Sequence, residues 1–389
     1  MIFNIAWKNF SRQGIRAVLN VVVTALAMIA VVFNISLYNG FQAQTTRNMI
    51  RTDVAGGHYQ APGFDILSPT EWEDHSLKVP EVLKNLPPSQ KAEALVQQGQ
   101  LFPNRRLYPV QLRGIDINQT LLDLPLEGLK SYREKVEDII PAVLGIKMAQ
   151  KAHLKKGDTA VLKWRDRFGV VDARDLLVVD VVTLVNSRVD GGVLWLRLDH
   201  LQDMTQRPDE VSWVAVAEYQ GPVQGIEFQT VDELISDILN LIKNERRYGK
   251  IFWVILIFLS GIGVFNTQIL NVFKRQKEIG TLMAFGMTSA QVVGLFTLEG
   301  SMAALLSVVV ALVLGTLLFT WFQSVGLDIS HLSESTIPVN ENILLDIHPG
   351  EVVSTMIIIV CIMVLVSWLP VRKITRLDPT LALRGRAIT

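Results

Sequence analysis

The stretch AVLNVVVTALAMIAVVFNISLY, residues 17–38, contains no charged side chain. A helix needs about 20 apolar residues to cross the ~30 Å hydrocarbon core of a bilayer, so this stretch is long enough to span a membrane. The basic residues Lys8, Arg12 and Arg16 precede it, as they would in a signal peptide. The apolar run is longer than a signal-peptide core and no clear cleavage site follows it, so we expect an uncleaved anchor.

Three further apolar segments predict transmembrane helices at 251–272, 290–322 and 352–370. Between the first and second spans lies a segment too long and too polar to be a loop, residues 39–250. It mixes strand and helix patterns. The predicted fold class is therefore a membrane protein with four transmembrane α-helices and a large α+β extracytoplasmic domain between helices 1 and 2.

The short segments that flank the spans differ in charge, which predicts their orientation. Residues 1–16, 273–289 and 371–389 are rich in Lys and Arg, whereas 323–351 contains five acidic residues and no Lys or Arg. The positive-inside rule places basic flanks in the cytoplasm. We expect a cytoplasmic N-terminal segment, a cytoplasmic loop at 273–289, a short extracytoplasmic loop at 323–351, and a cytoplasmic tail at 371–389.

Composition excludes several classes of protein. The chain has 37 basic and 37 acidic residues, so it offers no excess positive charge to nucleic acid. Cys361 is the single cysteine, and no G-x-x-x-x-G-K-[ST] or H-E-x-x-H motif occurs, which argues against a disulfide, a phosphate-binding loop and a zinc protease. We expect a non-enzymatic chain that has no catalytic residue, no metal site and no cofactor of its own.

Within 39–250, strand-like sequences occur in the second half, and prolines punctuate the part before residue 115. That first part is predicted to be loop-rich, and it could form a second subdomain. The strand-like stretches are 159–164, 176–185, 193–198 and 211–218.

Residues 231–248 carry apolar side chains at helical spacing, with neither proline nor glycine. Two interpretations carry equal weight. A stalk helix could continue through Gly249 into the second span as one lever, or a surface helix could end at Gly249. Where the chain leaves the first span, Gly56, Gly57 and His58 favour a tight turn at a strand start over a substrate contact.

The cytoplasmic loop KRQKEIGTLMAFGMT, residues 274–288, predicts a short helix with one apolar side. Gly286 could end this helix as a left-handed C-cap, and Thr288 with Gln291 matches a capping box that opens the next helix. Such a helix is either an interfacial helix packed on lipid or a docking element for a cytoplasmic partner.

Four segments resemble MacB/FtsX-type ABC transporter permeases. KRQKEIGTLMAFGMTSAQVVGLFTLEG is the most specific, and the other three are NGFQAQTTRNMIRTDVAGGHYQ, PAVLGIKMAQKAHLKKGDTAVL and LPVRKITRLDPTLALRG. The segment at 39–60 is most similar to the lipoprotein-releasing (LolC/LolE-like) branch. The resemblance implies a permease subunit that pairs with an identical or paralogous subunit and with two copies of a cytoplasmic ATPase, which supplies ATP and Mg²⁺ chemistry.

The resemblance also implies that the loop at 273–289 is a coupling helix seated in the ATPase. The implied contacts are Glu278, Ile279, Gly280, Leu282, Ala284, Phe285 and Gly286. Met283 departs from the family pattern, in which an arginine is frequent. In the tail, Arg376, Leu377, Asp378 and Pro379 form either a second ATPase contact or a simple basic stop at the lipid headgroups.

The implied cargo is a lipoprotein, or another amphiphile, extracted from the membrane lipid of the outer leaflet. The alternatives are mechanical signalling to an extracytoplasmic enzyme, and efflux with a periplasmic adaptor. Glu299 is the only ionisable residue in the predicted spans, and such residues are candidate functional groups. A proton relay would need partners in other spans, so hydrogen bonding within the bundle, or a cavity near the cytoplasmic leaflet, is favoured for Glu299.

Overall fold

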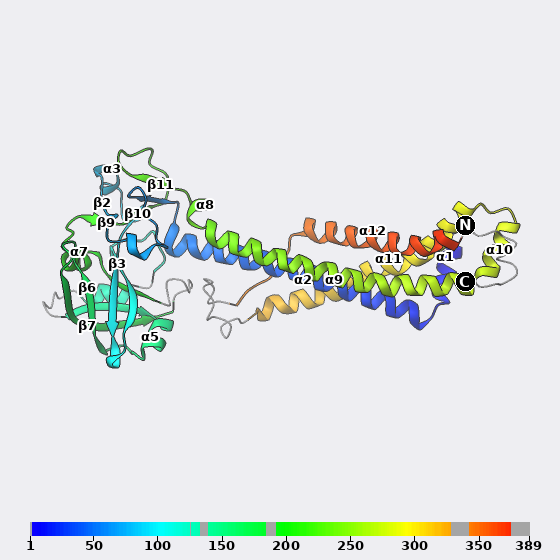
Figure 1. Ribbon diagram of the computed structural model, residues 1–389, viewed down its shortest axis with the longest axis horizontal. Coiled ribbons are helices and arrows are strands. Elements are labelled where there is room, and N and C mark those ends of the chain that lie inside the picture. The colour runs from blue at the N-terminus through cyan, green and yellow to red at the C-terminus, as the bar shows by residue number, and fades with distance from the viewer. Residues whose placement is uncertain (1, 125, 133–138, 184–191, 328–341, 375–389) are drawn as a thin grey trace. The chain divides into compact units, whose positions relative to one another are not determined.

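The computed structural model describes residues 2–124, 126–132, 139–183, 192–327 and 342–374 (Figure 1). The chain divides into two compact units. Unit 1 consists of Met1–Phe41, Ile242–Leu327 and Leu344–Thr389, and unit 2 consists of Gln42–Leu241 with the short segment that ends at Ile343.

Unit 1 is a helical bundle. Within the described residues, four helices are long and apolar enough to cross a membrane: α2 (Ile15–Met49), α9 (Ser236–Lys274), α11 (Ser289–Val325) and α12 (Pro349–Ile374). These helices contain the four predicted spans. Two shorter helices complete the unit, α1 (Ile2–Ser11), which packs against α11, and α10 (Gln276–Ala284).

All four long helices extend beyond the lengths that apolar runs predict. α2 continues as a π-helix, η1, over Ile50–Val54, and α12 passes through Pro370, which the sequence placed at the end of the fourth span. Membrane helices tolerate proline where neighbouring groups satisfy the freed backbone carbonyl. Apolar composition therefore locates the spans but underestimates the lengths of the helices.

Helix α9 shows no break at Gly249, so the prediction of a surface helix ending there is wrong. A Cβ atom on Gly249 would lie 3.1 Å from the Tyr38 ring, so the glycine permits close contact with α2. The break lies instead at Ile235, between α9 and the one-turn helix α8 (Val231–Leu234), which Thr230 and Glu233 open with a capping box. The long helix therefore begins at Ser236, five residues later than predicted.

Unit 2 is built on a mixed sheet of nine strands within the described residues, in the order β11-β1-β10-β3-β4-β8-β5-β7-β6. The strands are β1 (His58–Gln60), β3 (Lys91–Phe102), β4 (Tyr108–Ile115), β5 (Ile139–Gly145), β6 (Thr159–Arg165), β7 (Val171–Val182), β8 (Val193–Arg197), β10 (Trp213–Val216) and β11 (Glu227–Gln229). A small second sheet joins β2 (Leu77–Lys78) to β9 (Glu210–Val211). The helices are α3 (Glu81–Lys84), α4 (Glu127–Ser131), α5 (Ile146–Ala152) and α7 (Leu198–Thr205), with 3₁₀ turns η2 (Pro69–Glu71) and η3 (Pro103–Arg105).

The prediction of a loop-rich first part holds for residues 61–90, which contain only η2, β2 and α3, but not for residues 91–115, which form two long strands of the main sheet. β3 and β4 lie in the middle of the sheet, where they pair in antiparallel register from Ala94↔Ile115 to Leu101↔Tyr108. β3 was missed because polar residues interrupt its apolar pattern. One of them, Gln97, is buried and donates to a Glu73 carboxylate oxygen and to the Arg165 carbonyl, both at 3.0 Å. The four strand-like stretches predicted after residue 158 correspond to β6, β7, β8 and β10.

The turn predicted at Gly56 and Gly57 is confirmed. Gly57 has φ +134°, and a Cβ atom there would lie 2.4 Å from the Phe228 ring and 2.7 Å from the Gln229 carbonyl oxygen. A Cβ on Gly56 would lie 2.1 Å from the Ala217 carbonyl oxygen. Both glycines let the backbone enter β1 between β10 and β11, with which β1 pairs on its two edges.

We therefore expect Gly57→Ala to destabilise unit 2 by about 2–4 kcal/mol, since it adds backbone strain and a steric clash. The matched control is Gly192→Ala, because no atom of the described residues lies within 4 Å of its Cβ position and its φ is not in the left-handed region. That control should change the unfolding free energy by less than about 0.5 kcal/mol. Chemical denaturation of the two purified variants compares them, and equal midpoints would contradict the expectation.

Candidate functional site

The connection between α9 and α11 is a short helix, α10, that ends in a hydrogen-bonded C-cap. Gly286 has φ +94°, the Met287 amide donates to the Leu282 carbonyl at 3.1 Å, and the Gly286 amide donates to the Met283 carbonyl at 3.1 Å. These two bonds form a Schellman motif, so the predicted left-handed C-cap is confirmed. The capping box of Thr288 and Gln291 then opens α11, as predicted.

α10 divides the predicted contact residues between two faces. Phe285 is 85% exposed, and Glu278, Ala284 and Gly286 are exposed with it. Ile279 is only 2% exposed and packs in a cluster with side chains of α1 and α11, and Gly280 is also buried. Leu282 is half-buried against the same cluster.

Ile279 and Gly280 therefore hold α10 on the bundle, and they present no surface to a partner. Their contact with an ATPase stays a prediction, and in the chain alone these two residues face the bundle. The helix period explains the outcome, since a short helix that packs on a bundle must bury one side.

The second feature of this region is the surroundings of Glu299. Its side chain is 3% exposed and accepts hydrogen bonds from Arg275 Nη1 at 2.9 and 3.1 Å and from Gln13 Nε2 at 2.9 Å. Glu299 thus hydrogen-bonds within the bundle, the first of the two placements considered for it. Sequence reasoning missed these partners because both lie outside the predicted spans, although Arg275 comes only three residues after the end of the second one.

The predicted contact in the tail, Arg376, Leu377, Asp378 and Pro379, lies outside the described residues. Of the two predicted contact regions, only α10 lies within the described residues.

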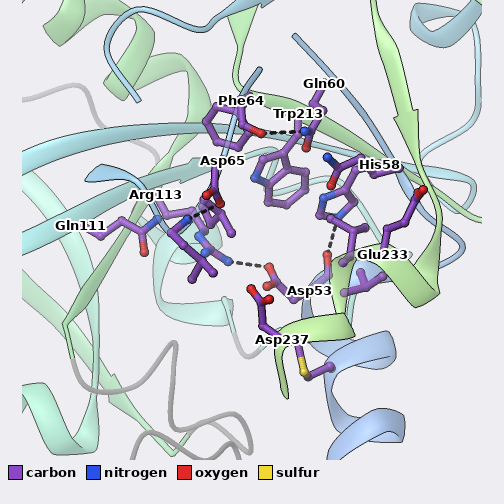
Figure 2. Close-up of a pocket in the computed structure, with 16 residues that line it drawn as sticks. Asp53, His58, Gln60, Phe64, Asp65, Gln111, Arg113, Trp213, Glu233 and Asp237 are labelled. Atoms are coloured by element: carbon purple, nitrogen blue, oxygen red, sulfur yellow. Dashed lines mark hydrogen bonds and ion pairs between the residues drawn. The ribbon is translucent and has the colours of Figure 1, made fainter. Parts of the chain in front are cut away.

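Unit 2 contains a separate pocket of about 170 Å³ (Figure 2). Arg113, at its wall, donates from Nη1 to Asp53 Oδ1 at 2.6 Å, and its side chain is 4% exposed. The guanidinium lies 5.2 Å from the Trp195 ring centre and 5.9 Å from that of Trp213. A buried charge needs both a counter-ion and good packing, and Arg113 has both. This ion pair ties η1 to strand β4.

His58 lies beside this ion pair, as Figure 2 shows. Its ring stacks on Trp213 with centres 4.4 Å apart and planes 4° apart, and Nε2 donates to the Asp53 carbonyl at 2.9 Å. Burial lowers the pKa of His58, with Asp53 opposing and Arg113 adding to the shift. The neutral ring is therefore a structural part of this wall, in keeping with the turn interpretation of Gly56–His58.

Comparison with known proteins gives a family for one third of the chain and a distant relative. Residues 250–379 match the FtsX-like permease C-terminal domain. Over 254 residues the chain is 22% identical to an uncharacterised ABC transporter permease of Methanocaldococcus jannaschii, an alignment that covers 60% of this chain and 58% of the relative. The two findings support the FtsX/MacB-type permease family. Together with the four apolar helices they support a multi-pass membrane protein.

The His58 environment predicts a pH dependence of stability. Because the folded pKa lies below the ordinary value of about 6.5, the unfolded chain binds the proton more readily. The stabilisation is complete above about pH 6.5 and is lost as the pH falls towards the folded pKa, by at most about 1.4 kcal/mol per pH unit.

We expect His58→Gln to reduce the loss of melting temperature between pH 7 and pH 5. The control His153→Gln alters an exposed histidine, so its melting temperature should fall between pH 7 and pH 5 as much as that of the wild type. Thermal unfolding of both variants at the two pH values is the measurement. If His58→Gln loses as much melting temperature between pH 7 and pH 5 as the wild type does, groups other than His58 cause the loss.

Proposed function

We propose that this chain is the permease subunit of an ATP-driven ABC transporter, and that the exposed face of α10 docks onto a separate cytoplasmic ATPase. The observation that carries the proposal is the division of α10 into two faces. Ile279 anchors the helix, while Phe285, 85% exposed, extends from its C-terminal end and Glu278 is exposed in its first turn. A large aromatic side chain held on a rigid support is typical of a binding hot spot.

In this proposal α10 and both chain ends lie in the cytoplasm of a bacterial inner membrane, and unit 2 lies outside. The basic residues around α10 and the acidic connection between α11 and α12 support that orientation. ATP and Mg²⁺ are bound by two copies of the ATPase, and the permease chain pairs with a second permease subunit, identical or paralogous. The match over residues 250–379 supports this arrangement because it contains α10 and the helices around it.

Helix α9 is the element that would carry the work. It is unbroken from Ser236 to Lys274, and only Arg275 separates it from α10. A helix rises about 1.5 Å per residue, so α9 is about twice as long as the ~30 Å hydrocarbon core requires. A movement of α10 on ATP binding would be transmitted along this helix.

We propose further that the cargo is a lipoprotein, released from the outer leaflet of the inner membrane. The likeness of residues 39–60 to the lipoprotein-releasing branch supports this cargo. The rival functions, mechanical activation of an extracytoplasmic enzyme and efflux with a periplasmic adaptor, use the same ATPase contact. They differ in what stimulates ATP hydrolysis.

The docking face predicts which substitutions break the complex. Glu278→Lys combined with Phe285→Asp should abolish co-purification of the ATPase in mild detergent, because it places repulsive and desolvated charges in the contact. Lys243→Gln, at an exposed position of α9 far along the chain from α10, is the control and should retain the ATPase. Retention by the double variant would refute docking on α10.

The cargo is tested with the permease–ATPase complex in nanodiscs. A triacylated lipoprotein should stimulate ATP hydrolysis several-fold and should leave the bilayer in the presence of ATP, whereas the same protein without its acyl chains should do neither. Stimulation by a soluble extracytoplasmic protein alone would favour mechanical signalling over lipoprotein release.

A further inference from the structure

The ion pair at the start of α10 connects parts of unit 1 that are distant in sequence. Arg275 is the single residue between α9 and α10 and is the N-cap of α10. Its Nε donates to Glu278 Oε2 at 2.6 Å, within α10 itself. Its Nη1 donates to both carboxylate oxygens of Glu299, in α11. One guanidinium therefore joins the first turn of α10 to the buried side of α11.

Packing holds the same guanidinium in place. It lies 4.9 Å from the ring centre of Phe296, which is 1% exposed. The planar fork of an arginine can bind two carboxylates and stack on an aromatic ring at the same time, and a lysine ammonium cannot. The geometry uses the particular properties of arginine at position 275.

Glu299 extends this connection in two further directions. Its Oε1 also accepts a hydrogen bond from Gln13, in the turn between α1 and α2. The next residue, Gly300, packs tightly against side chains of α9 and α12, since a Cβ there would lie 1.7 Å from Gln268 Nε2 and 2.0 Å from Ser367 Oγ. Glu299 and Gly300 together therefore contact α9, α12 and the turn that leads into α2.

We propose that Arg275 and Glu299 are positioning residues that fix α10 to α11, so that a displacement of α10 moves the bundle instead of bending the chain at Arg275. Without the ion pair, the side-chain contacts that hold α10 on the bundle, among the described residues, are the apolar contacts of Ile279 and its neighbours, and the one-residue connection to α9 loses the ion pair that fixes it to α11. The functional meaning of this junction rests on the proposed docking of an ATPase at α10. The rigidity of α10 does not, and it can be measured in the chain alone.

The first test is hydrogen exchange of the full chain in nanodiscs, with Glu299→Gln as the main variant. This change keeps the shape and the contact with Gln13 but removes the charge that holds Arg275, which remains paired with Glu278. Amides of α10 should exchange roughly tenfold faster or more, as expected for loss of a charge-assisted hydrogen bond, while amides of α12 and of unit 2 should not change.

Two further variants separate positioning from a general loss of stability. Arg275→Lys keeps the positive charge but loses the planar guanidinium. The exchange rate of its α10 amides should therefore lie between the rates in the wild type and in Glu299→Gln. Lys274→Gln removes the neighbouring exposed charge, for which no ion pair is present in the described residues, and should exchange as the wild type does. Unchanged α10 exchange in Glu299→Gln would overturn the proposal.

The second test adds the ATPase subunit. Glu299→Gln should still co-purify with it, because the exposed face of α10 is intact, but should lose at least half of the stimulation of ATP hydrolysis by cargo. Full stimulation despite a loosened α10 would also overturn the proposal. If the wild-type chain binds no ATPase, the proposed function fails, and the exchange measurements still decide whether Glu299 fixes α10.

Discussion

A carboxylate that is removed from water must be supplied with donors, and this requirement organises one end of the helical bundle. Glu299 obtains its donors from Arg275 and Gln13, two residues that belong to different turns between helices. Because removing one partner of a buried ion pair costs about 3–5 kcal/mol, the turns are held where the donors can reach. The positions of α1 and α10 against α11 follow from this one group, and apolar packing around Phe296 and Ile279 fills the space between them.

The same region shows how much of the fold could be predicted from the sequence. Long apolar runs located the four spans, and local signals located the caps at Gly286 and Thr288, because both depend on residues close together in the chain. The partner of Glu299 could not be found in this way, since Arg275 is 24 residues away and lies past the end of a helix. The buried face of α10 could not be predicted from the sequence either, because it depends on where the neighbouring helices lie.

In unit 2 the sequence-based predictions failed for a similar reason. β3 was missed because Gln97, Gln98 and Gln100 suggest an exposed segment, yet Gln97 is buried by partners from elsewhere in the chain. The ion pair of Asp53 and Arg113 joins residues 60 positions apart, and no local pattern indicates it. By contrast the turn at Gly57 was predictable, because its strained backbone is a property of a few adjacent residues.

The pairing of β1 with β11 has a consequence for how such a chain could evolve. β1 follows shortly after α2 and β11 comes shortly before α9, and the two strands lie side by side with His58 opposite Gln229. Unit 2 therefore receives and returns the polypeptide at neighbouring points, as domains that tolerate insertion usually do. A different domain whose ends are equally close could replace it without a change in the helices. Unit 2 is in that sense separable from the helices that precede and follow it in the chain.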